Sequence, residues 1–379
     1  MGTPFLYRRT ALAASYADAL LGLTPFDRSS GLFLAAPRRT GKTTFIENDL
    51  LAELQARGVT TTYADLWADR KRDPADLIAD ALRRTLGALD SPGLKAVRRV
   101  GLTRAGLGTW LSFDLGKIGT PDGATLTEVL RAVIERTGQP AALVIDEAQH
   151  ALTTEAGINA MFALKAARDA INGDVARGGQ PLLLVLTGSH RDKLANLVLR
   201  RDQPFFGATV SEFPRLGRGF TDAYTAWLNE RLASDNRFAP ADVWTAFDAL
   251  GERPEMLREV LEAAALGGGK AASLGAALAD GALTLRRRVW RDFEAEWAGL
   301  TALQRAVLER IAVTGVDFQP FAATAVAAYA SAIGRDVSVS DVQNAIDALR
   351  QRNLVWRSGR ANYALDDQEL AEWLRSMRA

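Results

Sequence analysis

The stretch that decides the fold is Gly31–Thr44, GLFLAAPRRTGKTT, in which a short apolar run leads into a loop that ends in Gly41-Lys42-Thr43. The run Gly31–Ala36 is typical of a buried strand. Phe45–Arg57 has the apolar spacing of a helix, and Gly58 follows as a natural stop. A strand, a loop and a helix are the context in which the pattern G-x-x-x-x-G-K-[ST] binds a polyphosphate. The sequence therefore predicts a phosphate-binding loop.

The residue types of this loop fit that chemistry. Glycine at position 41 tolerates the backbone angles that turn N–H groups inward, and the following helix adds its positive end. We expect Lys42 to reach the β- and γ-phosphates of ATP and the Thr43 hydroxyl to ligate Mg²⁺. Ala36 stands where a glycine is usual, and it is small enough for the loop to close. The residues predicted to bind ATP here are Ala36, Pro37, Arg38, Arg39, Thr40, Gly41, Lys42, Thr43 and Thr44.

A second motif is an apolar run that ends in two carboxylates, Leu143-Val144-Ile145-Asp146-Glu147. At the carboxyl end of a strand beside the phosphate loop, Asp146 is expected to hold Mg²⁺ together with Thr43. Glu147 is expected to orient and polarise the attacking water. The pattern alone also describes any strand that enters an acidic turn. Its pairing with the phosphate loop makes it indicative of one nucleotide-hydrolysing machine.

A third apolar run, Leu182–Leu186, leads into Thr187-Gly188-Ser189-His190. A polar side chain here would contact the γ-phosphate or the water, with Thr187 as first choice and Ser189 as second. The alternative is a capped turn that starts the next helix, where Ser and Thr are also favoured. We interpret His190 and the other histidine, His150, as turn residues. The predicted catalytic residues are thus Lys42, Asp146, Glu147 and Thr187.

Composition limits what else the chain does. The net charge is +1, so only a local basic surface would favour nucleic acid. The absence of cysteine excludes disulfides, thiolate metal sites and cysteine nucleophiles, and it fits the cytoplasm. No apolar run approaches the ~20 residues of a membrane helix, so no membrane contact is expected.

Strands and helices alternate over the first half of the chain. Apolar runs at Thr60–Leu66 and Ala142–Asp146 flank the helical pattern Pro74–Leu89, which predicts a parallel sheet covered on both faces. Trp110–Ile118 alternates as a small hairpin would. After Pro214 the pattern is almost entirely helical, and the Ala- and Gly-rich Ala264–Gly281 indicates a helix break and a loose connection.

These segments together resemble a known family. APRRTGKTT, LVIDEAQH, LLLVLTGSHRDKL and DQPFFGATVSEFPRL resemble the AAA+-type P-loop ATPases of the archaeal-ATPase-like branch of the STAND group. GERPEML resembles the small-x-x-Pro motif of that group's helical lid, and the C-terminal segment resembles its winged-helix domain. The resemblance implies an α/β P-loop NTPase of the ASCE class with sheet order 5-1-4-3-2. It divides the chain into an ATPase core (1–219), a helical lid (220–283) and a winged-helix domain (284–379).

The resemblance also implies site residues beyond the phosphate loop. Pro254 is expected to approach the adenine side of ATP. Some relatives carry a lid arginine just after this proline, where the chain has Glu255, and Arg253 and Arg258 are alternative substitutes. Arg200 and Arg201 lie where oligomeric relatives present an arginine finger to a neighbouring subunit. The alternative for that pair is a solvated helix end.

The C-terminal segment has helical patterns at Thr301–Ala312 and Val337–Leu349, followed by short strands on either side of Ser358-Gly359-Arg360. This order is the winged-helix plan. Four arginines near the second helix and the turn suit phosphate contacts with DNA, and they are Arg350, Arg352, Arg357 and Arg360. The negative charges of Asp341 and Asp347 on the same helix oppose such contacts. Arg286-Arg287-Arg288 is also basic and is alternatively a solvated helix face. DNA binding and a packing role both stay open.

Two functions are compatible with this sequence. The first is a regulatory or motor ATPase, an ATP phosphohydrolase that requires Mg²⁺ and whose ATP cycle moves the lid and winged helix relative to the core. The second is a nucleotide-gated module that hydrolyses little ATP and recruits DNA or protein, as in mobile-element or defence proteins. The expected partners are ATP, DNA through the winged helix, and a protein partner or a second copy of the chain.

Overall fold

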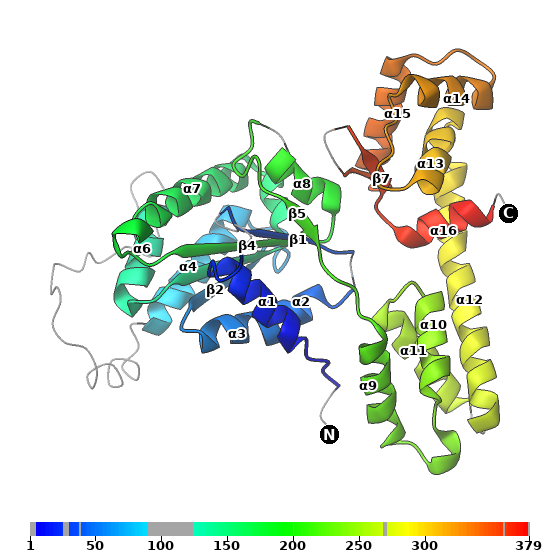
Figure 1. The fold of residues 1–379 in the computed structure, drawn as a ribbon, viewed down its shortest axis with the longest axis horizontal. Coiled ribbons are helices and arrows are strands. Elements are labelled where there is room, and N and C mark those ends of the chain that lie inside the picture. Colours follow the sequence, from blue (N-terminus) through cyan, green and yellow to red (C-terminus); the bar gives the residue numbers. More distant parts are fainter. Residues whose placement is uncertain are drawn as a thin grey trace.

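The computed structural model describes residues 5–25, 30–37, 39–89, 124–199, 201–267, 271–358 and 361–377. Its first part is a parallel sheet between two layers of helices (Figure 1). The strands lie in the order β2-β3-β4-β1-β5, which is the predicted order 5-1-4-3-2 read from the other edge. Their bounds are β1 Leu32–Ala35, β2 Thr60–Asp65, β3 Ala141–Asp146, β4 Leu182–Gly188 and β5 Val210–Glu212.

The strands read as unbroken apolar runs because both of their faces are buried. Leu32 and Leu34 of β1 face one cluster, whereas Phe33 and Ala35 face the other, as the alternation of a strand requires. The first layer holds α1 (Thr10–Leu20), α2 (Lys42–Phe45), the π-helical turn η1 (Ile46–Leu50) and α3 (Leu51–Ala56). The second layer holds α4 (Pro74–Leu89), α6 (Leu126–Thr137), α7 (Glu155–Asn172) and α8 (Arg191–Leu199).

Local signals set several of these helices. The predicted helix over Pro74–Leu89 is α4 to the residue, and the Ala75 backbone N–H donates to the Asp73 carboxylate at 2.8 Å, which caps it. The predicted helix over Phe45–Arg57 corresponds to the larger part of one continuous helical segment, which starts at Lys42 and ends at Ala56. The hairpin predicted at Trp110–Ile118 lies outside the described residues.

A helical unit follows the sheet, and we call residues 218–267 the lid unit. It contains α9 (Arg218–Asn229), the 3-10 turn η5 (Ser234–Asn236), α10 (Pro240–Ala249) and α11 (Pro254–Leu266). The next helix, α12 (Ala271–Ala298), has 28 residues and packs its first half on this unit. The chain is therefore almost entirely helical after Pro214, as predicted, until the short strands near its end.

The predicted helix break over Ala264–Gly281 is wrong from Ala271 onward, because α12 runs through it. Leu274 and Leu278 recur at helical spacing and bury against the lid unit. Gly281 serves close packing: a Cβ there would lie 2.7 Å from a methyl carbon of Val260 on α11. Gly275 and Gly281, two of the glycines that indicated a loose connection, instead allow α10 and α11 to pack closely against α12.

The last part, residues 301–377, is here called the C-terminal unit. It contains α13 (Ala302–Thr314), α14 (Ala323–Ile333), α15 (Val339–Gln351), the antiparallel hairpin β6 (Val355–Arg357) and β7 (Tyr363–Leu365), and α16 (Gln368–Ser376). Capping boxes at Thr301 and Ser338 start α13 and α15. Three helices followed by a hairpin match the order from which a winged helix was predicted.

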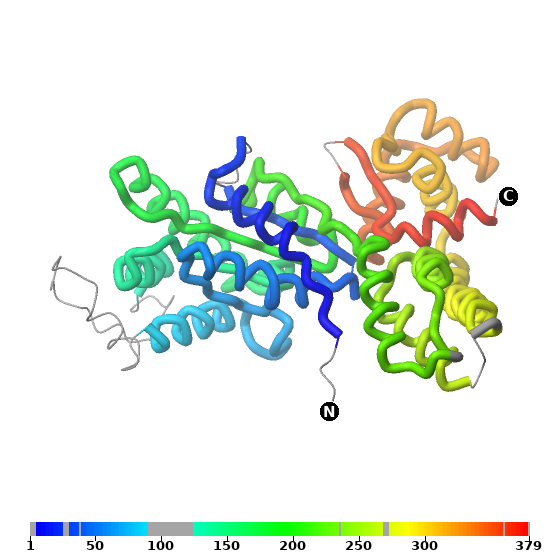
Figure 2. Tube along the Cα trace, turned by 60° about the horizontal axis from the view of Figure 1, so that its bottom comes forward, coloured from blue at the N-terminus to red at the C-terminus, as the bar shows by residue number. Residues whose placement is uncertain are grey.

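The three parts contact one another, and α12 runs from the lid unit into the C-terminal unit (Figures 1 and 2). It crosses residues 283 and 284, so the predicted division into 1–219, 220–283 and 284–379 stays a prediction. Arg253 of the lid unit donates to Asp367 of the C-terminal unit at 2.7 Å. In the described ranges, no helix combines the length and apolarity that crossing a bilayer requires.

Candidate active site

The loop between β1 and α2 has the shape of an anion cradle. Ala36 is fully buried and its backbone N–H donates to the Gly188 carbonyl at 3.0 Å, which ties the loop to β4. The Thr40 hydroxyl donates to the Pro37 carbonyl at 2.9 Å. Gly41 has φ 83° and no side chain caps the helix that starts after it. The backbone N–H groups at the positive end of this helix are therefore available to bind an anion.

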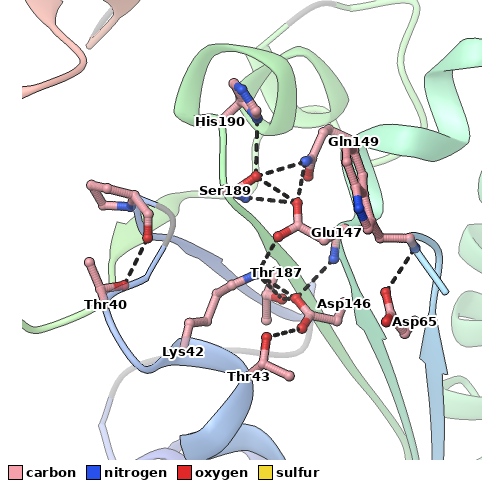
Figure 3. A network of polar contacts seen from close by, with 12 residues as sticks. Thr40, Lys42, Thr43, Asp65, Asp146, Glu147, Gln149, Thr187, Ser189 and His190 are labelled. Atoms are coloured by element: carbon pink, nitrogen blue, oxygen red, sulfur yellow. Dashed lines mark hydrogen bonds and ion pairs between the residues drawn. The ribbon is translucent and has the colours of Figure 1, made fainter. Parts of the chain in front are cut away.

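Lys42, at the start of α2, is buried against acidic side chains from the neighbouring strands (Figure 3). Its ammonium forms an ion pair with one oxygen of Asp146 and with Glu147 Oε1 at 3.1 Å. The Thr43 hydroxyl donates to the other oxygen of Asp146 at 2.7 Å. Lys42 and Thr43 of the loop therefore lie together with Asp146 and Glu147 of the acidic strand end, at the carboxyl edge of the sheet.

Thr187 and Ser189, at the end of β4, contact different acids. The Thr187 hydroxyl accepts from the Lys42 ammonium at 3.2 Å and donates to Asp146, and it is fully buried. The Ser189 hydroxyl instead donates to Glu147 Oε2 at 2.7 Å. Thr187 is therefore beside the residue predicted to hold the metal, and Ser189 is beside the one predicted to orient water.

Opposing effects act on the two carboxylates. Burial alone would raise the pKa of Asp146, but the Lys42 ammonium and donated hydrogen bonds hold that pKa below its usual value. Burial acts likewise on Glu147, where the Lys42 charge and the donors on Ser189 and Gln149 lower the pKa. Both groups are therefore ionised at neutral pH. A nearby acid on β2, Asp65, has a raised pKa, chiefly through burial and also through the charges of Asp146 and Glu147.

Two adjoining cavities open beside the loop. One, of about 370 Å³, is lined by the loop, by both carboxylates and by Asp65 and Trp67. The other, of about 580 Å³, is largely apolar and is lined by the N-terminal segment, the loop and the lid unit, with Pro254 among its residues. Both include Arg39, Gly41 and Thr44 in their walls. A polar cavity joined to an apolar one suits a ligand with a charged end and an aromatic end.

The residues predicted in the lid do not all reach this site. Arg258 lines the apolar cavity, whereas Arg253 pairs with Asp367 and Glu369 of the C-terminal unit. Glu255, in the first turn of α11, forms an ion pair with Arg39 of the loop at 3.0 Å. Of the two substitutes considered for a lid arginine, only Arg258 lines the cavity.

Other predictions on arginines and histidines have mixed outcomes. Arg38 and Arg200 lie outside the described residues, and Arg201 is exposed just after α8. The finger role of that pair stays a prediction. His150 stacks edge-on against Trp67 with ring centroids 4.3 Å apart, and His190 Nδ1 lies 3.1 Å from the Ser189 hydroxyl.

Sequence reasoning missed several residues of the site. Gln149 donates to Glu147 Oε2 at 2.5 Å, and Asp65 and Trp67 line the polar cavity. The aromatic residues of the N-terminal segment, Phe5 and Tyr7, line the apolar one. A signal existed for Gln149, which lies two residues after Glu147. None existed for the aromatic residues, because their neighbours come from the distant lid unit.

Two of the four arginines predicted to contact DNA pair with acids of this chain. Arg350 donates to Asp192 of α8 at 3.0 Å, and Arg352 donates to Glu296 of α12 at 2.9 Å. The Arg357 backbone N–H also donates to Asp192, at 3.2 Å. Arg360 lies outside the described residues. These contacts favour the packing role for the C-terminal unit.

The residues fit a magnesium–nucleotide ligand. Mg²⁺ usually takes one or two protein oxygens together with phosphate and water, and the Thr43 hydroxyl and Asp146 carboxylate are such a pair, 2.7 Å apart. No cluster of three or more His, Cys, Asp or Glu residues with metal-binding geometry occurs in the described part of the chain. A site of this kind therefore needs the phosphates to complete it.

Comparison with known proteins agrees with this geometry. Residues 27–194 match the family model described as an AAA domain, and no curated protein matches the chain. A Walker-type ATPase of Pyrococcus abyssi has a similar structure, with TM-score 0.55, 18% identity and coverage of 98% of this chain and 96% of that one. The ORC2 protein of Aeropyrum pernix in its ADP form has TM-score 0.54 and 14% identity, with coverage of 100% and 97%.

These findings confirm the predicted fold. The chain has an AAA-type P-loop ATPase fold, with a five-stranded parallel sheet in the expected order and further helical regions after it. The two structural neighbours named above come from archaea, and at their low identity they show the fold alone. The narrower STAND assignment stays a prediction.

Proposed function

We propose that the chain is a Mg²⁺-dependent ATPase whose nucleotide cycle moves the lid and C-terminal units relative to the core. One observation carries the proposal: Lys42 and Thr43 from one helix start meet Asp146 and Glu147 from one strand end. A cation, a hydroxyl and two ionised carboxylates around a polar cavity are the groups that phosphoryl transfer needs.

Each residue has a distinct role in the proposed reaction. Lys42 would leave the two carboxylates for the β- and γ-phosphates. Thr43 and Asp146 would hold Mg²⁺, which would neutralise the phosphate charge when bound. Glu147 orients the attacking water. Its lowered pKa keeps it ionised and therefore able to accept a hydrogen bond from that water. The apolar cavity, with Pro254 and the N-terminal aromatic residues, would take the base.

The proposed ATPase activity is tested by phosphate release from purified protein. Lys42→Ala should abolish it, and Glu147→Gln should still bind ATP while turnover falls about 10²- to 10⁴-fold, the usual worth of a positioned base. Lys165→Ala and Glu135→Gln, at solvated positions on α7 and α6, are matched controls that should retain wild-type turnover. Equal turnover in the wild type and both site variants would refute the proposal.

The proposed movement rests on contacts between the parts. Asp192, three residues beyond Ser189 on the same segment, accepts hydrogen bonds from Arg350 and from the Arg357 backbone of the C-terminal unit. Arg253 of the lid unit, next to Pro254 in the chain, pairs with Asp367 of α16. A change at the phosphates can therefore reach the C-terminal unit by two routes.

Because the chain has no cysteine, it can be labelled without background. Lys165→Cys on α7 and Ser331→Cys on α14 are suitable positions for a fluorophore pair, in the Glu147→Gln background that holds ATP. We expect the transfer efficiency to change when ATP and Mg²⁺ are added. A constant efficiency at saturating ATP would refute the movement but not the hydrolysis.

The second candidate is a nucleotide-gated recruiting module with little hydrolysis. The pair between Glu255 and Arg39 favours it, because an acid rather than an arginine of the lid faces the loop. Its signature is tight ATP binding with very slow release of phosphate, and ATP-dependent capture of a partner. Binding of duplex DNA at low salt would support its DNA form, whereas the internal pairing of Arg350 and Arg352 favours a protein partner.

A further inference from the structure

The carboxylate of Glu147 is held by one of its oxygens. Oε2 accepts three hydrogen bonds: from the Gln149 amide at 2.5 Å, from the Ser189 hydroxyl at 2.7 Å and from the Ser189 backbone N–H at 3.2 Å (Figure 3). Oε1 accepts only from the Lys42 ammonium, at 3.1 Å, among the bonds recorded for the described residues. The two oxygens of one acid therefore have different surroundings.

The backbone at this acid is unusual as well. Glu147 has φ 54°, a left-handed angle that costs a residue with a Cβ of the order of 1 kcal/mol. Such an angle persists only where neighbouring contacts impose it. These contacts include the hydrogen bonds to Oε2, the bond from the Glu147 N–H to Asp146 Oδ1 at 2.9 Å, and the bond from the His150 N–H to the Glu147 carbonyl at 2.9 Å.

Gln149 is placed for this contact rather than for contact with solvent. Its side chain is buried, and its amide nitrogen also lies 3.4 Å from the Ser189 hydroxyl. Its carbonyl oxygen has no hydrogen-bond partner in the described part of the chain. Gly188 makes room for it, because a Cβ at Gly188 would lie 2.4 Å from that oxygen. A buried amide oxygen without a hydrogen-bond partner costs free energy of folding. That this arrangement is nevertheless present indicates that the hydrogen bond from Gln149 to Glu147 has a function.

We propose that Gln149 is a positioning residue for Glu147, which it holds through Oε2, with the help of Ser189, so that Oε1 faces the phosphate cavity. This inference rests on the proposed ATPase activity. Once Lys42 moves to the phosphates, Oε1 is the acceptor that remains for the attacking water. The hydrogen bonds from Gln149 and Ser189 thereby fix the orientation of the carboxylate, and which oxygen is free, before the substrate binds. Such preorganisation of a reacting group speeds catalysis.

The test is the variant Gln149→Leu, which removes the donor and keeps most of the volume. We expect kcat to fall about 10- to 100-fold, the effect of a misplaced reacting group, while KM for ATP stays unchanged. Gln343→Leu is the matched control: Gln343 makes the same amide–carboxylate bond, at 2.9 Å to Asp347, on the exposed face of α15.

A second measurement asks whether Gln149 acts through Glu147. In the Glu147→Gln background, adding Gln149→Leu should leave the residual rate unchanged, because the group to be positioned is gone. If Gln149→Leu does not fold, as judged by circular dichroism, Ser189→Ala removes another donor from the same oxygen. It should also lower kcat while KM for ATP stays unchanged.

The outcomes separate the two proposals. Wild-type turnover that is lost in Glu147→Gln but unchanged in Gln149→Leu overturns the positioning role alone. The positioning role also fails if Gln149→Leu lowers the rate equally with and without Glu147, or if it raises KM for ATP and leaves kcat unchanged. Absence of ATP turnover in the wild type overturns both the proposed function and this inference.

Discussion

Glu369, in the first turn of α16, predicts a stability that depends on pH. It is 4% exposed, and no hydrogen bond to either of its carboxylate oxygens occurs in the described part of the chain. Arg253 of the lid unit lies 3.1 Å from one of them as an ion pair. Burial raises the pKa of Glu369 from 4.5 to about 7, and the Arg253 charge offsets part of that rise.

The sign and size follow from linkage. The folded state holds the proton more tightly than the unfolded chain, so the stability tied to Glu369 is fully present below about pH 4.5 and is lost as the pH rises towards 7. A pKa raised from 4.5 to about 7 corresponds to a loss of roughly 3 kcal/mol of stability above pH 7, at about 1.36 kcal/mol for each pH unit. Glu369→Gln carries no such charge and should avoid this loss.

The assay is urea unfolding followed by tryptophan fluorescence, at several values between about pH 5 and about pH 8. We expect Glu369→Gln to match the wild type near the acidic end and to be more stable by roughly 3 kcal/mol near the alkaline end. The control is Glu372→Gln, an exposed acid on the same helix that pairs with Arg286. Parallel curves for the wild type and Glu369→Gln at all pH values would refute the reasoning.

Three further predictions concern packing, docking and charge. Gly281→Leu should lower the free energy of unfolding by about 1–3 kcal/mol, because the new leucine side chain would clash with Val260. Ala276→Leu, on the exposed face of α12, is the control and should change the free energy of unfolding by less than about 0.5 kcal/mol. Arg350→Ala and Asp192→Ala, combined in a double-mutant cycle of unfolding free energies, should show a coupling of about 0.5–3 kcal/mol; strict additivity would mean that the ion pair does not hold the C-terminal unit to the core. Glu255 and Arg39 both line the apolar cavity beside the loop, so their charges should repel and attract the phosphates of ATP, respectively. In ATP titrations, Glu255→Gln should therefore tighten binding and Arg39→Ala should weaken it. Dissociation constants identical to that of the wild type would contradict this placement.

The loop and the acidic strand end could be predicted because their signals are local. Gly41-Lys42-Thr43 and Asp146-Glu147 each follow a run of apolar residues, and the ends of parallel strands meet at one edge of a sheet. The sheet order came with the resemblance that these motifs carry. The different partners of Thr187 and Ser189 could not be predicted, because β4 ends at Gly188 and the alternation of a strand no longer fixes the direction of the Ser189 side chain.

Other features depend on contacts between distant segments. Nothing near Arg350 in the sequence reveals that Asp192, far away along the chain, would bind it. The glycines of α12 have the same composition as a flexible connection, and only the approach of Val260 and Asp242 distinguishes a packed helix from a break. The sequence therefore leaves DNA binding and packing both open for these arginines, and in the structure Arg350 and Arg352 pair with acids of this chain.

The uninterrupted course of α12 has a mechanical consequence. Its 28 residues at 1.5 Å each make a rod of about 42 Å, with the lid helices packed near one end and the C-terminal unit at the other. From Gly281, where it packs on α11, to Ala298 the helix continues for 17 residues, or about 26 Å, so a tilt of about 10° at this contact would move the far tip by about 4–5 Å. Small adjustments beside Pro254 would thus arrive at α13 magnified, which a flexible linker in the same place could not transmit.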